Sequence, residues 1–314
     1  MTPGNLSSCL FLAGPTAVGK SELALLLAEN LNGEIISVDS MQVYRGMDIG
    51  TAKPSREERD RIPHHLIDII DVTEPFDAAR FIRLAAEAIE KILARGRLPI
   101  LCGGTGFYFS ALLGGLGTAP PANASLRAEL MAAPLPGLLE ELSQADPATY
   151  ETIDRQNPRR VVRAIEVIRL TGKPFSQQRS AWQTSASPAS ERPEFYYFSR
   201  SPAALHRRIE TRVDQMFQRG LVEETRCLLP LGLDQNLTAA QALGYRQVIE
   251  HLRGERALSE TIELVKVRTR QFAKRQITWF KKQPRVKRLD LQPDESLAVV
   301  AARLTDEWQS CYKR

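Results

Sequence analysis

The chain reads GPTAVGKS at residues 14–21, and this stretch decides the fold. It matches the pattern G-x-x-x-x-G-K-[ST], in which glycines let backbone N–H groups wrap around linked phosphates, the lysine adds a charge and the serine hydroxyl can hold Mg²⁺. An apolar run at 9–13 precedes it, and a leucine- and alanine-rich stretch at 22–29 follows it. Strand, loop and helix in this order predict a site for a ligand with linked phosphates.

Two further buried strands end in segments that should share the pocket of this loop. Residues 33–38 run directly into Asp39, and residues 98–102 run into the glycine-rich segment 103–106. In a parallel α/β sheet, ligands lie beyond the carboxyl ends of the strands. Strands and helices alternate over roughly the first 115 residues, which predicts a parallel sheet with right-handed crossovers. Asp39 should therefore face the phosphate loop.

A helical insertion interrupts this pattern after the third strand. The Pro- and Ala-rich segment 118–123 breaks the alternation, and only helical patterns lie between it and the Ser- and Pro-rich stretch 184–193. The last of these helices, at 159–170, has Asn157 as its N-cap and Gly172 just past its end. Both residues are strong boundary signals for a helix.

The core resumes after the insertion. An aromatic stretch at 194–199 predicts a strand, and residues 205–219 predict a helix that Gly220 stops. We therefore expect an α/β phosphate-loop core with a parallel sheet at 1–119, an all-helical inserted subdomain at 120–193, and at 194–314 a return to the core followed by a helical C-terminal region.

Charge is unevenly distributed along the chain. The net charge of +5 is only modestly basic and fits many proteins. Between Lys266 and Arg288, however, there are Lys and Arg residues but no Asp or Glu. Placed on a helix, one side collects Val265, Thr269, Phe272, Gln276, Trp279 and Phe280, with basic stripes flanking it. A solvated helix normally mixes both signs of charge, so the segment favours binding to a phosphate backbone.

Composition sets further limits on the kind of protein. No apolar run approaches the ~20 residues of a membrane helix, and no signal-peptide pattern opens the chain. The cysteines are scattered, without any C-x-x-C, at Cys9, Cys102, Cys227 and Cys311. Reduced cytosolic thiols have this distribution. We expect a cytoplasmic protein with no membrane contact, disulfide framework or zinc site.

Six sequence blocks carry a family resemblance that spans residues 14–280. They are GPTAVGKS at 14–21, DSMQVYRGMDIGTAKP at 39–54, IPHHLID at 62–68, GGTGFY at 103–108, ALGYRQ at 242–247 and TRQFAKRQITWF at 269–280. In these blocks the chain resembles the tRNA dimethylallyltransferase (tRNA isopentenyltransferase) family. The resemblance implies a monomeric, nucleotide- and ATP-binding class of phosphate-loop transferase. It also implies transfer of a dimethylallyl group from dimethylallyl diphosphate to N6 of the adenosine at tRNA position 37, immediately 3′ of the anticodon.

That reaction needs two chemical devices. The amine of adenine is a poor nucleophile, so Asp39 would accept its proton while fixing the base. The leaving diphosphate needs its charge absorbed, which Lys20, the loop N–H groups and Ser21 with Mg²⁺ would do. The loop residues assigned to the diphosphate are Gly14, Pro15, Thr16, Ala17, Val18, Gly19, Lys20 and Ser21. The resemblance assigns the same roles, and adds Thr16 beside the diphosphate and Arg212 as an extra cation. Three neighbouring arginines stay open as alternatives to Arg212, namely Arg207, Arg208 and Arg219.

An adenosine stacked in the anticodon loop must be flipped out to reach this pocket. The residues that the resemblance places against the tRNA anticodon stem-loop are Asp39, Ser40, Met41, Gln42, Thr105, Arg127, Arg159, Arg160, Val161, Val162, Arg163, Gln241, Ala242, Leu243, Gly244, Tyr245, Arg246, Lys274, Arg275, Gln276, Ile277, Thr278, Trp279, Phe280 and Lys281. For Leu243 and Ile277, packing in the core explains the residue type better than contact with RNA does, and for Met41 core packing stays open as an alternative.

Three other functions compete with this interpretation. A small-molecule kinase would bind ATP at the same loop and use Asp39 to deprotonate a hydroxyl, but it does not need a basic C-terminal helix. An adenine-nucleotide isopentenyltransferase would share residues 14–108, with less use for the arginines at 159–163 or the basic segment 266–288. A plain RNA-binding module leaves the phosphate loop and Asp39 unexplained.

Overall fold

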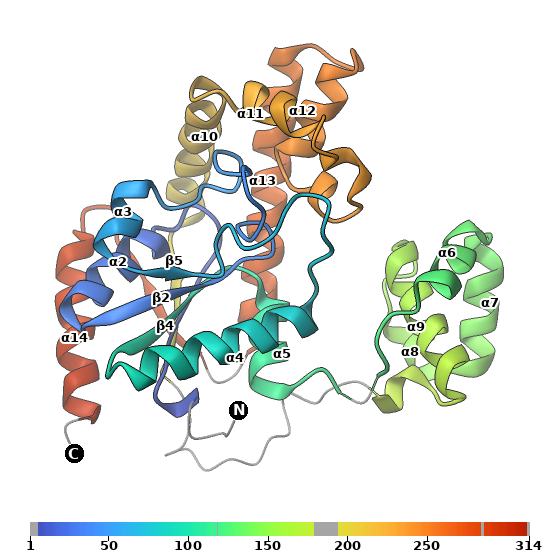
Figure 1. The fold of residues 1–314 in the computed structure, drawn as a ribbon, viewed down its shortest axis with the longest axis horizontal. Helices are drawn as coiled ribbons and strands as arrows, with labels where there is room; N and C mark the ends of the chain where they lie inside the picture. Colours follow the sequence, from blue (N-terminus) through green and yellow to red (C-terminus); the bar gives the residue numbers. More distant parts are fainter. Residues whose placement is uncertain (1–5, 118, 179–193, 284–285, 313–314) are drawn as a thin grey trace. The chain divides into compact units, whose positions relative to one another are not determined.

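The computed structural model describes residues 6–117, 119–178, 194–283 and 286–312, and Figure 1 shows its ribbon. The chain forms two compact units, one made of Met1–Phe109 with Ser187–Arg314 and the other of Ser110–Ala186. The division falls inside helix α5 (Gly106–Gly114) and not at the Pro- and Ala-rich segment where the sequence suggested it.

The first unit is built on a six-stranded sheet in which all strands are parallel. The strands are β1 (Leu10–Ala13), β2 (Gly33–Val38), β3 (His64–His65), β4 (Leu98–Gly103), β5 (Glu194–Ser199) and β6 (Lys287–Asp290), and their order is β3-β2-β4-β1-β5-β6. β1 lies between β4 and β5, with Leu10 opposite Ile100 on one side and Glu194 on the other. The apolar strands β1, β2 and β4 are buried almost throughout, as parallel strands covered on both faces are. The short edge strands β3 and β6 were not predicted.

Side chains of β1 alternate between two apolar layers. Leu10 and Leu12 pack in the cluster that contains Leu23 of α2 (Lys20–Asn30). Phe11 points to the other face, where its ring centroid lies 6.2 Å from that of Phe109 in α5. The alternation is the period-2 pattern of a strand. It fixes the end of β1, and with it the phosphate loop, between two packed layers.

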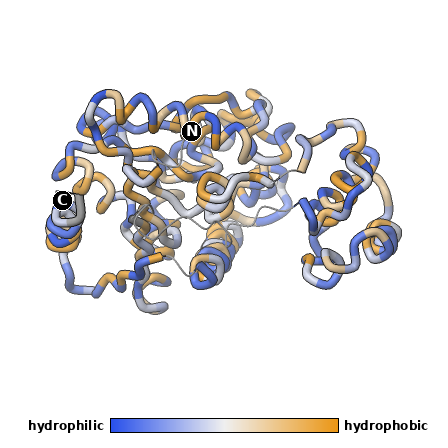
Figure 2. Tube along the Cα trace, turned by 90° about the horizontal axis from the view of Figure 1, so that it is seen from below, coloured by the Kyte–Doolittle hydropathy of each residue, from blue (hydrophilic) through white to orange (hydrophobic). Residues whose placement is uncertain are grey.

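Several helices of this unit flank the sheet in Figure 1, and others lie beyond them, away from the sheet. Besides α2 and α5 they are α3 (Arg56–Arg61), α4 (Ala78–Ala94), α10 (Pro202–Gln218), α11 (Leu221–Leu228), α12 (Tyr245–Leu252), α13 (Leu258–Lys281) and α14 (Leu297–Tyr312), with short 3₁₀ turns η4 (Leu233–Gln235) and η5 (Ala239–Gln241). α14 packs on α2, and α10 packs on α13. Hydrophilic and hydrophobic residues alternate along the outer helices in Figure 2, as amphipathic helices require.

The second unit is all-helical where it is described. It contains α6 (Ala124–Ala132), α7 (Leu135–Ala145), α8 (Pro147–Thr152), α9 (Pro158–Thr171) and η1 (Phe175–Gln178). Gly172 ends α9 in the left-handed conformation with φ 68°, as predicted, and Asn157 is the N-cap, although its side chain makes no capping hydrogen bond. α8 was not predicted; Asp146 caps it by accepting a 3.0 Å hydrogen bond from the backbone N–H of Thr149.

Among the helices of the described ranges, none combines the length and the apolar composition that crossing a bilayer requires.

Candidate active site

The phosphate loop connects β1 to α2 and has an unusual backbone. Ala17 has φ 64° and Gly19 has φ 108°, both in the left-handed region. A Cβ on Gly14 would lie 2.9 Å from the backbone oxygen of Phe198, so a side chain there would push the loop away from β5. α2 begins directly after the loop, at Lys20. The N-terminus of a helix and the loop N–H groups together make an anion site.

Two arginines hold the loop from the side of α10. Arg200 donates from Nε to the backbone oxygen of Val18 at 2.8 Å, and Arg208 donates from Nε to that of Ala17 at 2.7 Å. Both bonds use carbonyl oxygens and therefore occupy none of the loop N–H groups. These contacts turn a glycine-rich turn into a fixed cradle.

Lys20, Arg212 and Asp39 interact electrostatically. Burial is the largest cause that lowers the pKa of Lys20, the positive charge of Arg212 lowers it further, and the negative charge of Asp39 raises it. Burial also lowers the pKa of Arg212, with Asp39 and Arg208 acting in opposite directions. Two cations so close together make a site that an anion with several charges would stabilise.

Asp39 stands at the carboxyl end of β2. Its Oδ1 accepts hydrogen bonds from the backbone N–H groups of Met41 at 2.8 Å and Gln42 at 3.3 Å. Its Oδ2 accepts none from the residues that the structure describes. The side chain is thus oriented through one oxygen, and the other oxygen is available to a ligand.

The ends of β1, β2 and β4 meet around one small pocket, as the sequence suggested. Its lining residues are Thr16, Lys20, Ser21, Asp39, Gln42, Thr51, Ala52, Cys102, Gly103, Gly104, Arg212, Phe272 and Gln276. The third strand reaches the pocket through Gly103 and Gly104, while Thr105 is half-buried directly after them.

A larger cavity of about 670 Å³ adjoins this pocket and shares Lys20, Ser21 and Arg212 with it. Its apolar lining residues include Leu25, Ile35, Ile49, Ile67 and Met216. Its basic lining residues include Arg207, Arg208 and Arg219. The two spaces therefore meet at the phosphate loop, and the larger one offers cations and apolar side chains together.

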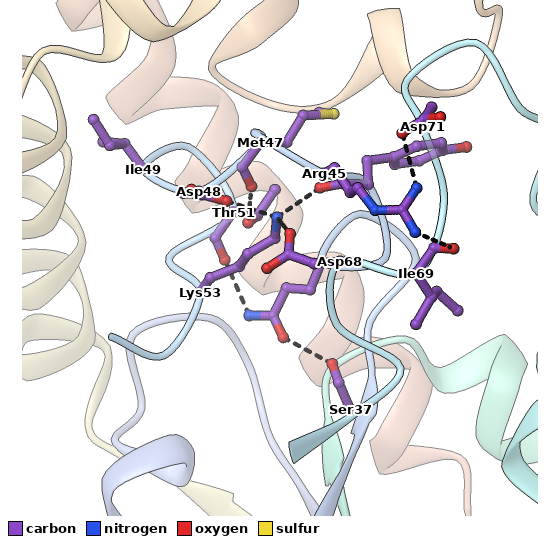
Figure 3. Close-up of polar contacts among 12 residues, drawn as sticks. Ser37, Arg45, Met47, Asp48, Ile49, Thr51, Lys53, Asp68, Ile69 and Asp71 are labelled. Atoms are coloured by element: carbon purple, nitrogen blue, oxygen red, sulfur yellow. Dashed lines mark hydrogen bonds and ion pairs between the residues drawn. The ribbon is translucent and has the colours of Figure 1, made fainter. Parts of the chain in front are cut away.

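The block 39–54 is closed into a loop by its own polar groups (Figure 3). Lys53 is buried, and its Nζ donates to the backbone oxygen of Tyr44 at 2.6 Å and to Asp48 Oδ1 at 2.7 Å, with Asp68 as a third acceptor. Gln42 accepts from the hydroxyl of Ser37 at 2.7 Å. Through Nε2, Gln42 also donates to the backbone oxygens of residues 51 and 52. The structure thus gives Gln42 an internal role at the border of both spaces.

The segment 241–246, which the sequence predicted to contact tRNA, packs against the loop 39–54. Glu224 of α11 accepts from the backbone N–H of Ile49 at 2.8 Å, and the hydroxyl of Tyr245 donates to the same carboxylate. A Cβ on Gly50 would lie 2.4 Å from the ring of Tyr245. Tyr245 and Ala242 are buried, so their side chains are packing residues. Glu224, which no sequence motif singles out, anchors the loop.

Arg246 and Gln241 are the exposed members of that segment. Arg246 donates from Nη1 to Gln241 Oε1 at 2.8 Å and from Nε to Glu250 Oε1 at 3.1 Å. Leu243 is half-buried against the main core, which supports packing over contact with RNA. The two exposed side chains are the ones a ligand on this surface would meet.

Helix α13 borders the small pocket with one side and exposes its basic residues on the other. Gln276 and Phe280 are buried, and Ile277 is packed against the core. Phe272 lies on the same side of the helix as Gln276, as the spacing predicted, and both line the small pocket. Phe272 is nevertheless 38% exposed, and the Arg275 guanidinium lies 5.7 Å from its ring centroid.

The basic residues of α13 divide into two groups. Lys266 pairs with Asp214 at 2.8 Å, and Arg270 pairs with Glu210 at 2.8 Å, so these two hold α13 on α10. The others are exposed and form no ion pair among the described residues; they are Arg268, Lys274, Arg275 and Lys281. This second group is available to bind a phosphate backbone.

In the helical unit, some of the residues expected to contact RNA are buried and others are exposed. Val161 and Val162 are buried in its apolar core, so their side chains cannot meet a ligand. Glu166 is fully buried and binds the guanidinium groups of Arg127 and Arg163, each at 2.7 Å. Arg159 and Arg160 are exposed, whereas Arg127 and Arg163 are half-buried.

A parallel sheet that opens on such a loop defines a phosphate-loop α/β enzyme. The family model described as IPP transferase matches residues 42–283. The chain belongs to the tRNA dimethylallyltransferase family, and it is a transferase. The family and the fold class expected from the sequence are thereby confirmed.

Individual relatives agree over almost the whole chain. The tRNA dimethylallyltransferase of Pelotomaculum thermopropionicum is 43% identical over 310 residues, covering 95% of this chain and 96% of that protein. The enzyme of the same name from Geobacter sulfurreducens is 42% identical over 305 residues, covering 96% and 97%. The sequence likeness therefore extends over nearly the whole chain, and the family model itself spans the insertion and the basic helix.

Solved structures are similar as well. The full-length tRNA isopentenylpyrophosphate transferase of Bacillus halodurans gives a TM-score of 0.71 at 38% identity, covering 97% of this chain and 96% of that one. A eukaryotic dimethylallyltransferase, studied acting on tRNA, gives a TM-score of 0.78 at 29% identity, covering 96% and 79%.

Proposed function

We propose that this protein transfers the dimethylallyl group of dimethylallyl diphosphate to N6 of the adenosine at position 37 of tRNA. The products are N6-(dimethylallyl)adenosine and diphosphate. The observation that carries the proposal is the meeting of two spaces at Lys20 and Arg212, one with Asp39 at its wall and one with apolar side chains.

The larger cavity suits the allylic diphosphate. Lys20, Arg212 and the loop N–H groups would bind the diphosphate, and apolar residues such as Ile49 and Met216 would contact the prenyl chain. As the allylic C–O bond breaks, its electron pair passes to the diphosphate. Preorganised cations stabilise that charge, which is usually the largest catalytic term.

The small pocket suits the flipped adenine. The N6 lone pair forms the new bond to the allylic carbon, and the displaced proton goes to Asp39. Because Oδ1 is already held by two backbone N–H groups, Oδ2 is the oxygen expected to take the proton. A base fixed at the attack distance contributes through both positioning and proton transfer.

Mg²⁺ fits the loop as a partner of the substrate phosphates. Among the described residues, no group of three or more His, Cys, Asp or Glu could hold a metal by itself. Ser21 and Asp39 line the same pocket, however, and Mg²⁺ is usually held by one or two protein oxygens together with phosphate and water. The Ser21 hydroxyl would hold the ion, which would supply charge neutralisation for the diphosphate.

Exposed basic residues would bind the tRNA backbone. Lys274, Arg275 and Lys281 offer such a surface on α13, and Arg159 and Arg160 offer one on α9. We further propose that the enzyme works as a monomer in the cytoplasm, where its tRNA substrate is found.

Substrate choice can be tested directly. The protein would be mixed with labelled dimethylallyl diphosphate and either tRNA, the same tRNA with guanosine at position 37, or AMP. We expect label in the first only. Label in AMP would show an adenine-nucleotide isopentenyltransferase, and ATP consumption without prenyl transfer would show a small-molecule kinase.

A further inference from the structure

One side chain of α13 connects the phosphate loop to the end of β4. Gln276 Oε1 accepts a hydrogen bond from the backbone N–H of Thr16 at 2.9 Å, and Gln276 Nε2 donates to the backbone oxygen of Gly104 at 3.0 Å. The side chain is buried, with 7% of its surface exposed. Its amide therefore bridges two strand ends that border the small pocket.

The surroundings leave space for this amide and for little else. A Cβ on Gly104 would lie 2.2 Å from Gln276 Nε2, and a Cβ on Gly106 would lie 2.4 Å from the ring of Trp279. The glycines after β4 thus let α13 approach the pocket closely. The fit shows that Gln276 is held in one position.

The chemistry of a neutral amide matches these two partners. It accepts at one end and donates at the other, whereas an ionised carboxylate only accepts and a thioether does neither well. The bond to Thr16 matters because N–H groups of a phosphate loop form the concave anion site, so their positions decide how well a phosphate fits. Losing a buried hydrogen bond would let this part of the loop move.

We propose that Gln276 is a positioning residue for the diphosphate site, acting through Thr16, and that it does not bind the tRNA backbone as the exposed cations of α13 would. The resemblance places the segment 274–281 against the tRNA, and within it the geometry separates Gln276 from its exposed neighbours Lys274 and Arg275. This inference rests on the proposed function, since it assigns the loop to a diphosphate.

The test uses RNA-free protein and inorganic diphosphate. We expect Gln276→Met to bind diphosphate roughly tenfold more weakly by calorimetry, as the loss of a buried hydrogen bond implies. Its affinity for tRNA alone should stay unchanged. The matched control, Lys274→Gln on the exposed side of the same helix, should give the reverse pattern.

A second variant keeps the test independent of how well the first one folds. Gln276→Glu accepts from Thr16 in both protonation states, but donates to Gly104 only when protonated. Burial raises the pKa of such a carboxyl. Its diphosphate affinity, relative to wild type at each pH, should therefore recover as the pH falls.

The possible results distinguish a failure of this proposal from a failure of the proposed function. The proposal is overturned if Gln276→Met binds diphosphate normally and loses tRNA affinity, or if Gln276→Glu shows no recovery at lower pH. Prenylation assays with the wild type test the proposed function independently of these affinities. If wild type binds diphosphate but does not modify tRNA, the proposed function fails while the role of Gln276 in the loop is still decided by these affinities.

Discussion

Arg208 donates a hydrogen bond from its Nε to the backbone oxygen of Ala17, across 2.7 Å. Ala17 has φ 64°, a conformation that residues with a side chain seldom adopt, so the bond supports a strained turn. Arg212, one turn later on α10, lines both spaces of the candidate site. The two arginines of one helix therefore have different roles: Arg208 binds the backbone of the loop and lines only the larger cavity, whereas Arg212 lines both spaces.

Exchanging each of these arginines for glutamine tests that division. We expect Arg212→Gln to weaken diphosphate binding roughly ten- to hundredfold, because a charge-assisted hydrogen bond is worth about 1.5–3 kcal/mol. Arg208→Gln should instead lower the free energy of unfolding by about 1 kcal/mol, with a smaller loss of affinity. Calorimetry and urea denaturation measure the two effects. Equal affinity losses in the two variants would contradict the assignment.

Removing the carboxylate should stop the chemical step. We expect Asp39→Asn to lower single-turnover prenylation with saturating tRNA by ~10²–10⁴-fold, the usual contribution of a positioned base. Asparagine can still accept from the backbone N–H of Met41, so diphosphate binding should persist. A rate loss below tenfold would mean that another group takes the proton.

Lys20 should lower the stability of the free enzyme. Its pKa is lowered by burial, so the folded protein binds its proton less tightly than the unfolded chain does. The resulting loss of stability is present at neutral pH and disappears as the pH rises toward 10.5, the ordinary pKa of lysine. We expect Lys20→Met to raise the free energy of unfolding at pH 7 and to abolish diphosphate binding.

The pH dependence of the stability difference between Lys20→Met and wild type serves as the control for this prediction. The stability difference between Lys20→Met and wild type should shrink as the pH approaches 10.5, because the wild-type lysine then loses its charge. Denaturation curves across this range measure it. If Lys20→Met is instead less stable than wild type at neutral pH, interactions of the charged lysine in the free enzyme outweigh the penalty of burying it.

The exposed cations of α13 should bind tRNA. We expect replacement of Arg268, Lys274, Arg275 and Lys281 by glutamine to weaken tRNA binding and to flatten its salt dependence, by up to ~0.7 in slope for each phosphate that is no longer bound if single-strand values apply. Affinity for dimethylallyl diphosphate should change little. The matched control is Lys266→Gln with Arg270→Gln, since those two cations already pair with acidic residues of α10. Unchanged affinity and salt slope in the first variant would identify α13 as a solvated surface.

Contiguous motifs made much of the site predictable from sequence. Lys20 and Asp39 each follow a buried strand, and the rule for parallel sheets is enough to bring them to one edge. The role of Gln276 could not be predicted, because its partners Thr16 and Gly104 are distant in sequence and a helical pattern does not identify what a buried side contacts. Helical spacing placed Phe272 on the same side as Gln276, where both line the pocket, but spacing does not show how far that side is covered, and Phe272 is 38% exposed.

Several residues expected to touch RNA turned out to have internal partners. Arg127 and Arg163 match the family pattern, yet both bind the buried Glu166. Basic side chains in a sequence show charge but not whether it is already neutralised. Residue spacing likewise provided no sign of Glu224, whose partners are backbone N–H groups and the hydroxyl of Tyr245.

The place of β1 in the sheet has a consequence for synthesis of the chain. β1 emerges early and pairs with β4, but its other neighbour is β5, which follows the entire helical insertion. Until β5 leaves the ribosome, the strand that leads into the phosphate loop keeps one open edge, a surface prone to wrong pairing. The insertion packs around its own apolar core and so can bury its apolar side chains during that interval, before the sheet is complete.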